Sequence, residues 1–317
     1  MSEALHVLAV TPLSPLWAPQ LKARFTVHDR VHELDPAVFE RVAPTIRAVA
    51  TGGDGKVPAA LIERLPALEI ISVMGVGYDG VDSAAAKARG IPVTHTPDVL
   101  NDDVADLAIG LMLCAARQLP QSDRWVRDGS WAAKGNLPLQ RKMSGARLGV
   151  VGMGRIGQAI ATRALAFGMS IAYCTRNARP ELPYRHMADV VQLAAESDFL
   201  VVITPGGAAT RHLIDARVLE ALGRKGILVN VARGSVVDEA ALIDALERGT
   251  LGGAALDVFE DEPRVPERLR ALPQVVLAPH VGSATTATRQ AMADLAQANL
   301  VAHFGGKPLL TPTPESR

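Results

Sequence analysis

The stretch "ARLGVVGMGRIGQAIATRALAFG", residues 146–168, decides the fold of this chain. It begins with a short apolar run, which predicts a buried strand, and it continues with the periodicity of an amphipathic helix. Between the two lie Gly152, Gly154 and Gly157 in the spacing G-x-G-x-x-G. At a strand-to-helix turn this spacing predicts a dinucleotide site, because the glycines allow a tight turn, close approach of the pyrophosphate and close helix–strand packing. The alternative is an ordinary glycine-rich turn in an α/β sheet.

The next segment, "SIAYCTRNAR" at 170–179, bears on which dinucleotide binds. Where this second strand ends, an NAD site places Asp or Glu against the ribose 2′-hydroxyl. This chain has Thr175 and Arg176 instead, a hydroxyl and a cationic fork that suit a 2′-phosphate. Arg179 offers a second cation. We therefore expect NADP(H) as cofactor with NAD(H) as a weaker alternative; otherwise these basic residues are solvated loop charges and cofactor choice is relaxed.

Alternating strands and helices extend on both sides of this stretch, as in parallel α/β proteins. The stretch itself opens a series of strands at 146–154, and this series continues at 170–174, 198–204, 226–232, 252–259 and 274–280. Helices at 156–167, 188–195, 216–222 and 238–247 separate the first five of these strands. Before it we expect strands at 6–10, 46–51, 68–75 and 91–96, helices at 58–65, 81–89 and 102–117, and a weakly periodic segment with tryptophans at 123–143. A last helix is expected at 285–303. The fold class is thus α/β with two doubly wound parallel sheets. Because the last helix follows the second series, it can return to the first, which would make the outer domain discontinuous.

Composition narrows the class of protein. The chain has 317 residues, enough for two domains, and 33 Lys+Arg balance 33 Asp+Glu. That balance argues against a nucleic-acid or anionic-lipid surface. Neither a signal peptide nor a long apolar span is recognised, and Cys114 and Cys174 lie in apolar runs typical of buried free thiols. We expect a cytoplasmic protein without membrane or nucleic-acid partners and without a metal site.

Three polar groups follow successive strands of the second series. Arg233 follows one strand in "NVARGSVVDEAAL", acidic residues follow the next in "LDVFEDEP", and His280 follows the last in "LAPHVGSAT". The carboxyl ends of parallel strands share one edge, where ligands bind. There a guanidinium can hold a substrate carboxylate and polarise its carbonyl, an imidazolium can donate a proton, and a carboxylate can fix the tautomer of the histidine. The set suits reduction of a 2-oxo acid, although each residue alone is more often structural.

The chain resembles the D-2-hydroxyacid dehydrogenase family along essentially its whole length. The matching stretches are "VGYDGVD" (76–82), "VADLAIGLML" (104–113), "GMGRIGQAIA" (152–161), "VNVARGSVVDEAAL" (229–242), "ALDVFEDEP" (255–263) and "APHVGSAT" (278–285). Within the family it looks most like the glyoxylate/hydroxypyruvate reductases and the similar hydroxyphenylpyruvate reductases.

The resemblance implies a role for individual residues. It selects Glu262, and not Glu260, as the partner of the acid/base His280, and it makes Arg233 the residue that binds substrate and polarises the carbonyl. It implies that backbone N–H groups at Val76 and Gly77 receive the substrate carboxylate. The remaining cofactor contacts that it implies are Arg155, Ile156, Thr204, Pro205, Val231 and Asp257.

The resemblance also implies an architecture and an activity. It implies two Rossmann-like or flavodoxin-like domains with the active-site cleft between them: a substrate-binding domain of residues 1–100 plus 287–317, and an NADP(H)-binding domain of 101–286. A homodimer would form through the helix at 102–117 and the arm with tryptophans; the alternative is local packing of Trp125 and Trp131 within one chain. The expected activity is NADPH-dependent reduction of glyoxylate to glycolate and hydroxypyruvate to D-glycerate. The alternatives are reduction of aromatic 2-oxo acids such as hydroxyphenylpyruvate, and a non-catalytic, dinucleotide-sensing protein of the corepressor type.

Overall fold

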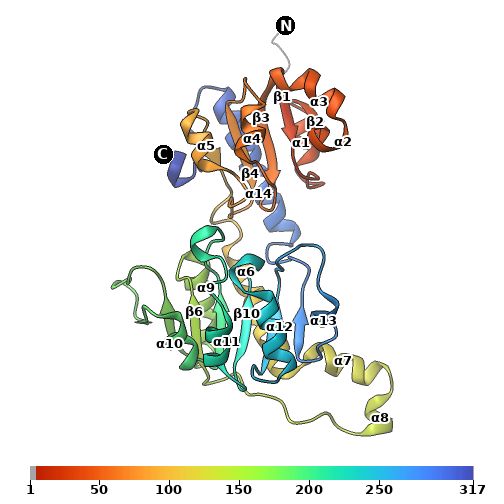
Figure 1. Cartoon of the computed structure of the whole chain (residues 1–317), viewed down its shortest axis with the longest axis vertical. Helices are drawn as coiled ribbons and strands as arrows, with labels where there is room; N and C mark the ends of the chain where they lie inside the picture. Colours follow the sequence, from red (N-terminus) through yellow and green to blue (C-terminus); the bar gives the residue numbers. More distant parts are fainter. Residues whose placement is uncertain (1–4, 317) are drawn as a thin grey trace. The chain divides into compact units, whose positions relative to one another are not determined.

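The computed structural model describes residues 5–316, which form two compact units (Figure 1). Unit 1 holds the described residues up to Leu100 together with those from Thr285 onward, and unit 2 runs from Asn101 to Ala284. The chain passes from one unit to the other twice. The sequence predicts the first passage between residues 100 and 101 and the second between residues 286 and 287.

Unit 1 is built on a five-stranded parallel sheet in the order β2-β1-β3-β4-β5. The strand order reverses at β1, so the sheet is doubly wound in the flavodoxin-like manner. The sequence predicts every strand except β2, whose residues "TVHD" lack an apolar run. The strands are β1 (His6–Ala9), β2 (Thr26–Asp29), β3 (Ile46–Gly52), β4 (Ile70–Met74) and β5 (Val93–Thr94).

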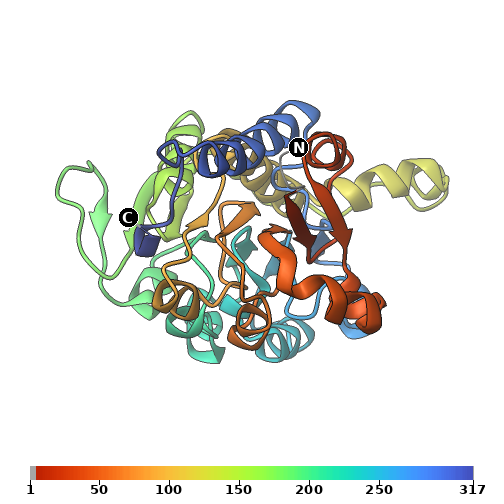
Figure 2. The same cartoon turned by 90° about the horizontal axis from the view of Figure 1, so that it is seen from above.

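Helices cover both faces of this sheet, as the view in Figure 2 shows. On one face, Phe39 of α3, Leu61 of α4 and Ala86 of α5 pack on apolar strand residues. On the other face α14 packs against β4, where the Ser72 hydroxyl donates to the Ala296 carbonyl at 3.1 Å. The helices are α1 (Ala18–Lys22), α2 (Val31–Leu34), α3 (Pro36–Val42), α4 (Ala59–Glu63), α5 (Ser83–Ala88) and α14 (Thr286–Phe304), with 3-10 turns η1 (Ala43–Thr45) and η4 (Pro314–Ser316).

Unit 2 is built on a seven-stranded parallel sheet in the order β12-β11-β10-β9-β6-β7-β8. The order reverses at β6, the strand that precedes the glycine-rich turn, so this is a Rossmann-like sheet with its switch point between β6 and β9. The sequence predicts six of these strands; β8 is a two-residue strand that pairs with the edge of β7. The strands are β6 (Arg147–Val151), β7 (Ser170–Cys174), β8 (Arg185–His186), β9 (Phe199–Val202), β10 (Ile227–Asn230), β11 (Gly253–Leu256) and β12 (Val275–Leu277).

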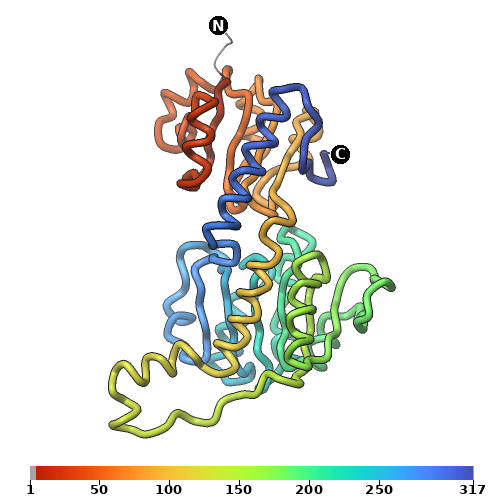
Figure 3. Tube along the Cα trace, turned by 180° about the vertical axis from the view of Figure 1, so that it is seen from behind, coloured from red at the N-terminus to blue at the C-terminus, as the bar shows by residue number. Residues whose placement is uncertain are grey.

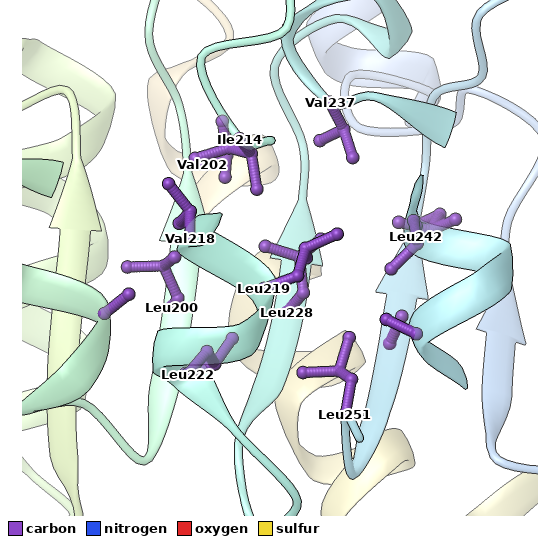
Figure 4. Close-up of a cluster of buried hydrophobic side chains, with 14 of the residues drawn as sticks. Leu200, Val202, Ile214, Val218, Leu219, Leu222, Leu228, Val237, Leu242 and Leu251 are labelled. Atoms are coloured by element: carbon purple, nitrogen blue, oxygen red, sulfur yellow. The ribbon is translucent and has the colours of Figure 1, made fainter. Parts of the chain in front are cut away.

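The core of unit 2 lies between this sheet and the helices α10, α11 and α12. Figure 4 shows Val218, Leu219 and Leu222 of α11 against Leu200 of β9 and Leu228 of β10. Helices α6 and α9 pack on each other, and α6 also contacts β10 and β11. The helices are α6 (Asn101–Arg117), α7 (Leu119–Arg127), α8 (Ser130–Lys134), α9 (Arg155–Leu165), α10 (Val190–Ala195), α11 (Ala216–Leu222), α12 (Glu239–Glu247) and α13 (Glu267–Arg270), with η2 (Ala208–Thr210) and η3 (Gly234–Val236).

The weakly periodic segment of the sequence is an arm of unit 2 formed by α7, α8 and the extended chain that returns to β6 (Figure 3). Helix α7 has no buried residue, and the buried residue of α8 is Ser130. Both cysteines are free, as the sequence predicts, but each is half-buried rather than buried. Within residues 5–316, no helix has both the length and the apolar character needed to cross a membrane.

Candidate functional site

The glycine-rich turn follows β6 at the switch point of the unit 2 sheet. Gly152 has φ +101°, and a Cβ there would lie 2.8 Å from the backbone nitrogen of Thr204, so the turn packs against the end of β9. A Cβ at Gly157 would lie 2.2 Å from the Gly152 carbonyl oxygen. A Cβ at Gly154 would meet no described atom within 4 Å. Two glycines therefore make the turn and its packing, and the third leaves an open approach, which fits a dinucleotide.

Helix α9 begins directly after this turn. Its first residues are Arg155 and Ile156, and its N-cap Gly154 supplies no side chain to cap the helix. The first N–H groups of a helix have no partner within the helix, and the helix dipole makes this end positive. The start of α9 is thus able to bind a phosphate group.

The β7–β8 loop holds the basic residues that replace the expected acid. The Thr175 hydroxyl donates to the Asn177 carbonyl at 2.7 Å, and the His186 ring Nε2 lies 3.0 Å from the Thr175 carbonyl oxygen. Arg176 is exposed, and no residue in the described range 5–316 forms an ion pair or hydrogen bond with its guanidinium. Arg179 instead donates to the Met153 carbonyl and to Glu181. The two arginines therefore have different environments.

Arg233 lies in the turn after β10, and two residues that the sequence analysis did not single out shape this turn. The buried Asn230 side chain accepts from Ala232 N–H and donates to the Arg233 carbonyl, both at 3.0 Å. A Cβ at Gly234 would lie 1.9 Å from the Phe259 carbonyl carbon, so the two loops touch through their backbones. The sequence contains one indication of this role, because Asn230 is a polar residue at the end of an otherwise apolar strand.

His280 and Glu262 form a hydrogen-bonded pair across the ends of β12 and β11. Nδ1 of His280 lies 2.7 Å from Oε2 of Glu262, while Oε1 of Glu262 accepts from the Phe259 N–H at 3.0 Å. Burial alone would raise the pKa of Glu262, but the hydrogen bonds from His280 and Phe259 and the positive charges of His280 and Arg233 together lower it. An ionised carboxylate only accepts hydrogen bonds, so Nδ1 carries a proton. Nε2 remains as the second ring nitrogen.

Asp257, at the end of β11, binds the loop that carries His280. It accepts from the N–H groups of Val281 at 2.7 Å and Gly282 at 2.8 Å, and His280 N–H donates to its carbonyl at 2.8 Å. His280 itself has φ +53°, an uncommon value for a residue other than glycine. Burial raises the pKa of Asp257, although the hydrogen bonds from the N–H groups of Val281 and Gly282 act in the opposite direction.

In unit 1, Val76 and Gly77 follow β4 as the sequence predicts. The His95 ring Nδ1 lies 2.9 Å from the Val76 carbonyl oxygen. This contact fixes the direction of the Val76 carbonyl. Because the peptide between Val76 and Gly77 is planar and trans, the Gly77 N–H points to the opposite side. Tyr78 contacts His95 edge to face, with ring centroids 5.2 Å apart, and its hydroxyl donates to Glu315 at 3.1 Å.

Thr204 and Pro205 follow β9, and Val231 follows β10, so the remaining cofactor candidates lie at the same sheet edge as the glycine turn. No cluster of three or more His, Cys, Asp or Glu side chains in the described part of the chain is placed to bind a metal ion.

Comparison with known proteins decides the family. The sequence pattern of the D-isomer specific 2-hydroxyacid dehydrogenase NAD binding domain matches residues 109–282. The chain belongs to the D-isomer specific 2-hydroxyacid dehydrogenase family. It is 50% identical over 311 residues to a glyoxylate/hydroxypyruvate reductase A from Arabidopsis thaliana, which covers 98% of this chain and 99% of that protein. It is 48% identical to a hydroxyphenylpyruvate reductase from Plectranthus scutellarioides, with 98% of this chain and 99% of that protein covered.

A solved structure resembles this D-2-hydroxyacid dehydrogenase over nearly its full length. It is the NADPH-dependent glyoxylate/hydroxypyruvate reductase of Sinorhizobium meliloti in complex with NADP and malonate, with a TM-score of 0.94 and 46% sequence identity. The likeness covers 99% of this chain and 98% of that one. The expected fold class, two Rossmann-like α/β domains with parallel sheets, is confirmed, and so is the expectation of an enzyme of this family.

Proposed function

We propose that this D-2-hydroxyacid dehydrogenase reduces small 2-oxo acids with NADPH, converting glyoxylate to glycolate and hydroxypyruvate to D-glycerate. The observation that carries the proposal is the 2.7 Å hydrogen bond between His280 and Glu262. These residues follow β12 and β11, and Arg233 follows the adjacent strand β10. The reductases of A. thaliana and S. meliloti support the choice of substrate class, since both are named for glyoxylate and hydroxypyruvate.

The chain's own residues fit the cofactor. Gly152, Gly154 and Gly157 form the turn that would receive the pyrophosphate, and Arg155 and Ile156 begin the helix beside it. Arg176 would bind the 2′-phosphate, joined by Thr175 once its hydroxyl leaves the Asn177 carbonyl. The nicotinamide, when bound, supplies the hydride. The further contacts that we assign to the cofactor are Thr204, Pro205, Val231 and Asp257.

Substrate binding and proton transfer fall to three side chains. Arg233 holds the substrate carboxylate and polarises the carbonyl that is reduced. His280 donates a proton from Nε2 to the carbonyl oxygen, while Glu262 keeps Nδ1 protonated and orients the ring. Backbone N–H groups at Val76 and Gly77 contribute further donors to the carboxylate. His95 supports the assignment of Gly77, because its contact with the Val76 carbonyl holds the peptide that carries the Gly77 N–H in one orientation.

A second candidate is reduction of an aromatic 2-oxo acid. The 48% identity to a hydroxyphenylpyruvate reductase favours it. The two activities use the same arginine, glutamate and histidine and differ only in the group attached to the substrate carbonyl.

We also propose that the protein forms a homodimer through α6 and the arm. The arm exposes large apolar side chains, among them Val126 and Trp131, each 57% exposed. Both indole N–H groups bond within the arm, Trp125 to the Gly135 carbonyl and Trp131 to Asn136, so local contacts hold the arm but do not cover it. Light scattering on the purified protein tests this, and a Trp131→Glu variant should shift the mass from dimer to monomer.

One experiment tests the proposed activity. Steady-state rates are measured on glyoxylate, hydroxypyruvate, pyruvate and phenylpyruvates with NADPH and with NADH. We expect the highest kcat/KM with glyoxylate or hydroxypyruvate and NADPH, and an Arg176→Met variant should lose the preference for NADPH. Faster turnover with NADH at equal concentration contradicts the cofactor assignment, and faster turnover of phenylpyruvates favours the second candidate.

A further inference from the structure

Arg179 joins the two parts of the cofactor site that bind phosphate. Its guanidinium Nη1 donates to the Met153 carbonyl at 2.7 Å, and its Nε donates to Glu181 Oε1, also at 2.7 Å. Met153 lies between the first two glycines of the turn after β6, whereas Arg179 lies in the loop after β7. One side chain thus connects the turn to the loop that carries Arg176.

The backbone of Arg179 is hydrogen-bonded as well as its side chain. The Tyr173 hydroxyl accepts from Arg179 N–H at 2.8 Å and lies 3.2 Å from the Arg179 carbonyl, to which it donates. Tyr173 belongs to β7 and is only 1% exposed, so it ties this residue to the sheet. With both ends fixed, the guanidinium has little freedom to turn toward a ligand.

The bond to Met153 acts on the peptide that joins Met153 to Gly154. Its carbonyl oxygen and the Gly154 N–H point in opposite directions because the peptide is planar and trans. Arg179 holds the carbonyl, with a weaker contact from Gln158 Nε2 at 3.4 Å. The N–H of Gly154 is thereby kept on the opposite side of the peptide.

We propose that Arg179 is a positioning residue for the dinucleotide phosphates and not a second ligand of the 2′-phosphate. Through Met153 it orients the pyrophosphate turn, and through its own backbone it places Arg176. Glu181 holds the guanidinium in this orientation. This inference rests on the proposed binding of NADPH. It assigns a role to a residue that the sequence leaves either as a second cation for the 2′-phosphate or as a loop charge.

The two roles differ in which cofactor they affect. A ligand of the 2′-phosphate matters for NADPH alone, because NADH lacks that group. A residue that orients the pyrophosphate turn matters for both cofactors, because both contain the pyrophosphate. Glu181 distinguishes the roles by sign: beside a phosphate ligand its carboxylate repels the phosphate, whereas beside a positioning residue it strengthens binding.

The test uses calorimetry to measure the equilibrium binding of NADPH and of NADH to the full-length protein without substrate. We expect Arg179→Met to weaken both by about tenfold, the effect of one charged hydrogen bond. Glu181→Gln should weaken both more modestly. Arg179→Lys should not restore binding, because one ammonium cannot replace the planar fork that reaches Met153 and Glu181 together. Arg217→Met, which removes an exposed partner of Asp215, is the matched control and should change neither affinity.

Two results overturn the proposal. If Arg179→Met weakens only NADPH while Glu181→Gln strengthens it, Arg179 is a phosphate ligand. If Arg179→Met changes neither affinity, it is a solvated charge. Failure of the proposed NADPH preference shows separately, as tighter binding of NADH by the unaltered protein or as equal effects of Arg176→Met on both cofactors. Circular dichroism of each variant checks that the fold is retained.

Discussion

The carboxylate of Asp257 lies 2.7 Å from the backbone nitrogen of Val281, the residue that follows His280. Its second oxygen accepts from Gly282 N–H, and its carbonyl accepts from His280 N–H. Asp257 is 2% exposed, so these bonds are shielded from water. The loop that carries His280, the proposed proton donor, is therefore held by one buried residue that directly follows β11.

Replacing Asp257 with alanine should destabilise the protein. Two backbone N–H groups would lose their acceptor at a cost of about 1–3 kcal/mol each, and the removal of a buried carboxylate offsets only part of this. Urea unfolding at neutral pH measures the change. The exposed Asp123→Ala variant, which breaks a surface pair with Arg127, is the control and should change stability by no more than about 0.5 kcal/mol. Equal stability of the Asp257 variant and the unaltered protein would contradict this role.

Replacing His280 with asparagine should abolish most turnover and spare cofactor binding. The loss of a positioned proton donor is expected to lower kcat by about 10²–10⁴-fold. NADPH affinity should stay near its original value, because the turn that we propose binds the phosphates lies after a different strand. Steady-state rates and NADPH titration measure the two quantities. Turnover that survives this change would rule out His280 as the donor.

Glu262→Gln should lower both turnover and stability, and the loss of stability should depend on pH. In the folded protein the pKa of Glu262 lies below its ordinary value of 4.5. A lowered pKa means that the ionised carboxylate stabilises the fold above the unfolded pKa, and that this contribution is lost as pH falls through the folded pKa. The difference in unfolding free energy between the two proteins should therefore be present at pH 7 and shrink below pH 4.5.

Glu260→Gln is the matched control for turnover. Glu260 is two residues from Glu262 but bonds to Arg211 and His212 instead of His280. Its variant should keep nearly full turnover. A comparable loss in both variants would mean that the negative charge of this loop, and not the hydrogen bond to His280, supports the reaction.

Much of the fold and of the candidate site could be predicted from the sequence, because parallel strands that are apolar along their length bring their carboxyl ends to one edge. That is why the strand ends alone predict Arg233, the acidic residues of "LDVFEDEP" and His280 as candidates, whereas the choice of Glu262 over Glu260 depends on the family resemblance. Strand β2 was missed because its residues are largely polar.

Contacts between loops were not predictable. The approach of Gly234 to Phe259 joins residues 25 positions apart through backbone packing, which leaves no periodic signal. The direction of the Arg179 side chain depends on the Met153 carbonyl and on Glu181, and sequence spacing says nothing about either contact. The pattern therefore identified both arginines of the loop but not the difference between them.

One tyrosine should lose its hydroxyl proton only at unusually high pH. Burial, followed by the hydrogen bond to Glu315 and its negative charge, raises the pKa of Tyr78 to about 12. Ultraviolet titration of the three tyrosines should show one group ionising near that value, and Glu315→Gln should bring it down. Since the folded pKa lies above the ordinary 10.0, stability gained from neutral Tyr78 is lost as pH rises from 10 to about 12. A titration in which the Glu315 variant matches the unaltered protein would contradict the contact.

The glycines at 154 and 157 allow fold and cofactor binding to be tested separately. A Cβ at Gly157 would lie 2.2 Å from the Gly152 carbonyl oxygen, so Gly157→Ala should lower the unfolding free energy by about 1–3 kcal/mol through overpacking. At Gly154 a Cβ meets no described atom within 4 Å and φ is −72°, so Gly154→Ala should change stability by less than about 0.5 kcal/mol.

The same Gly154→Ala variant should nevertheless bind NADPH and NADH more weakly, because the added methyl group occupies the space through which the pyrophosphate approaches the backbone. Urea unfolding and dinucleotide titration of both variants give the result. If Gly154→Ala binds both dinucleotides normally while its stability is unchanged, the pyrophosphate does not approach at this glycine, and the site must begin further along α9.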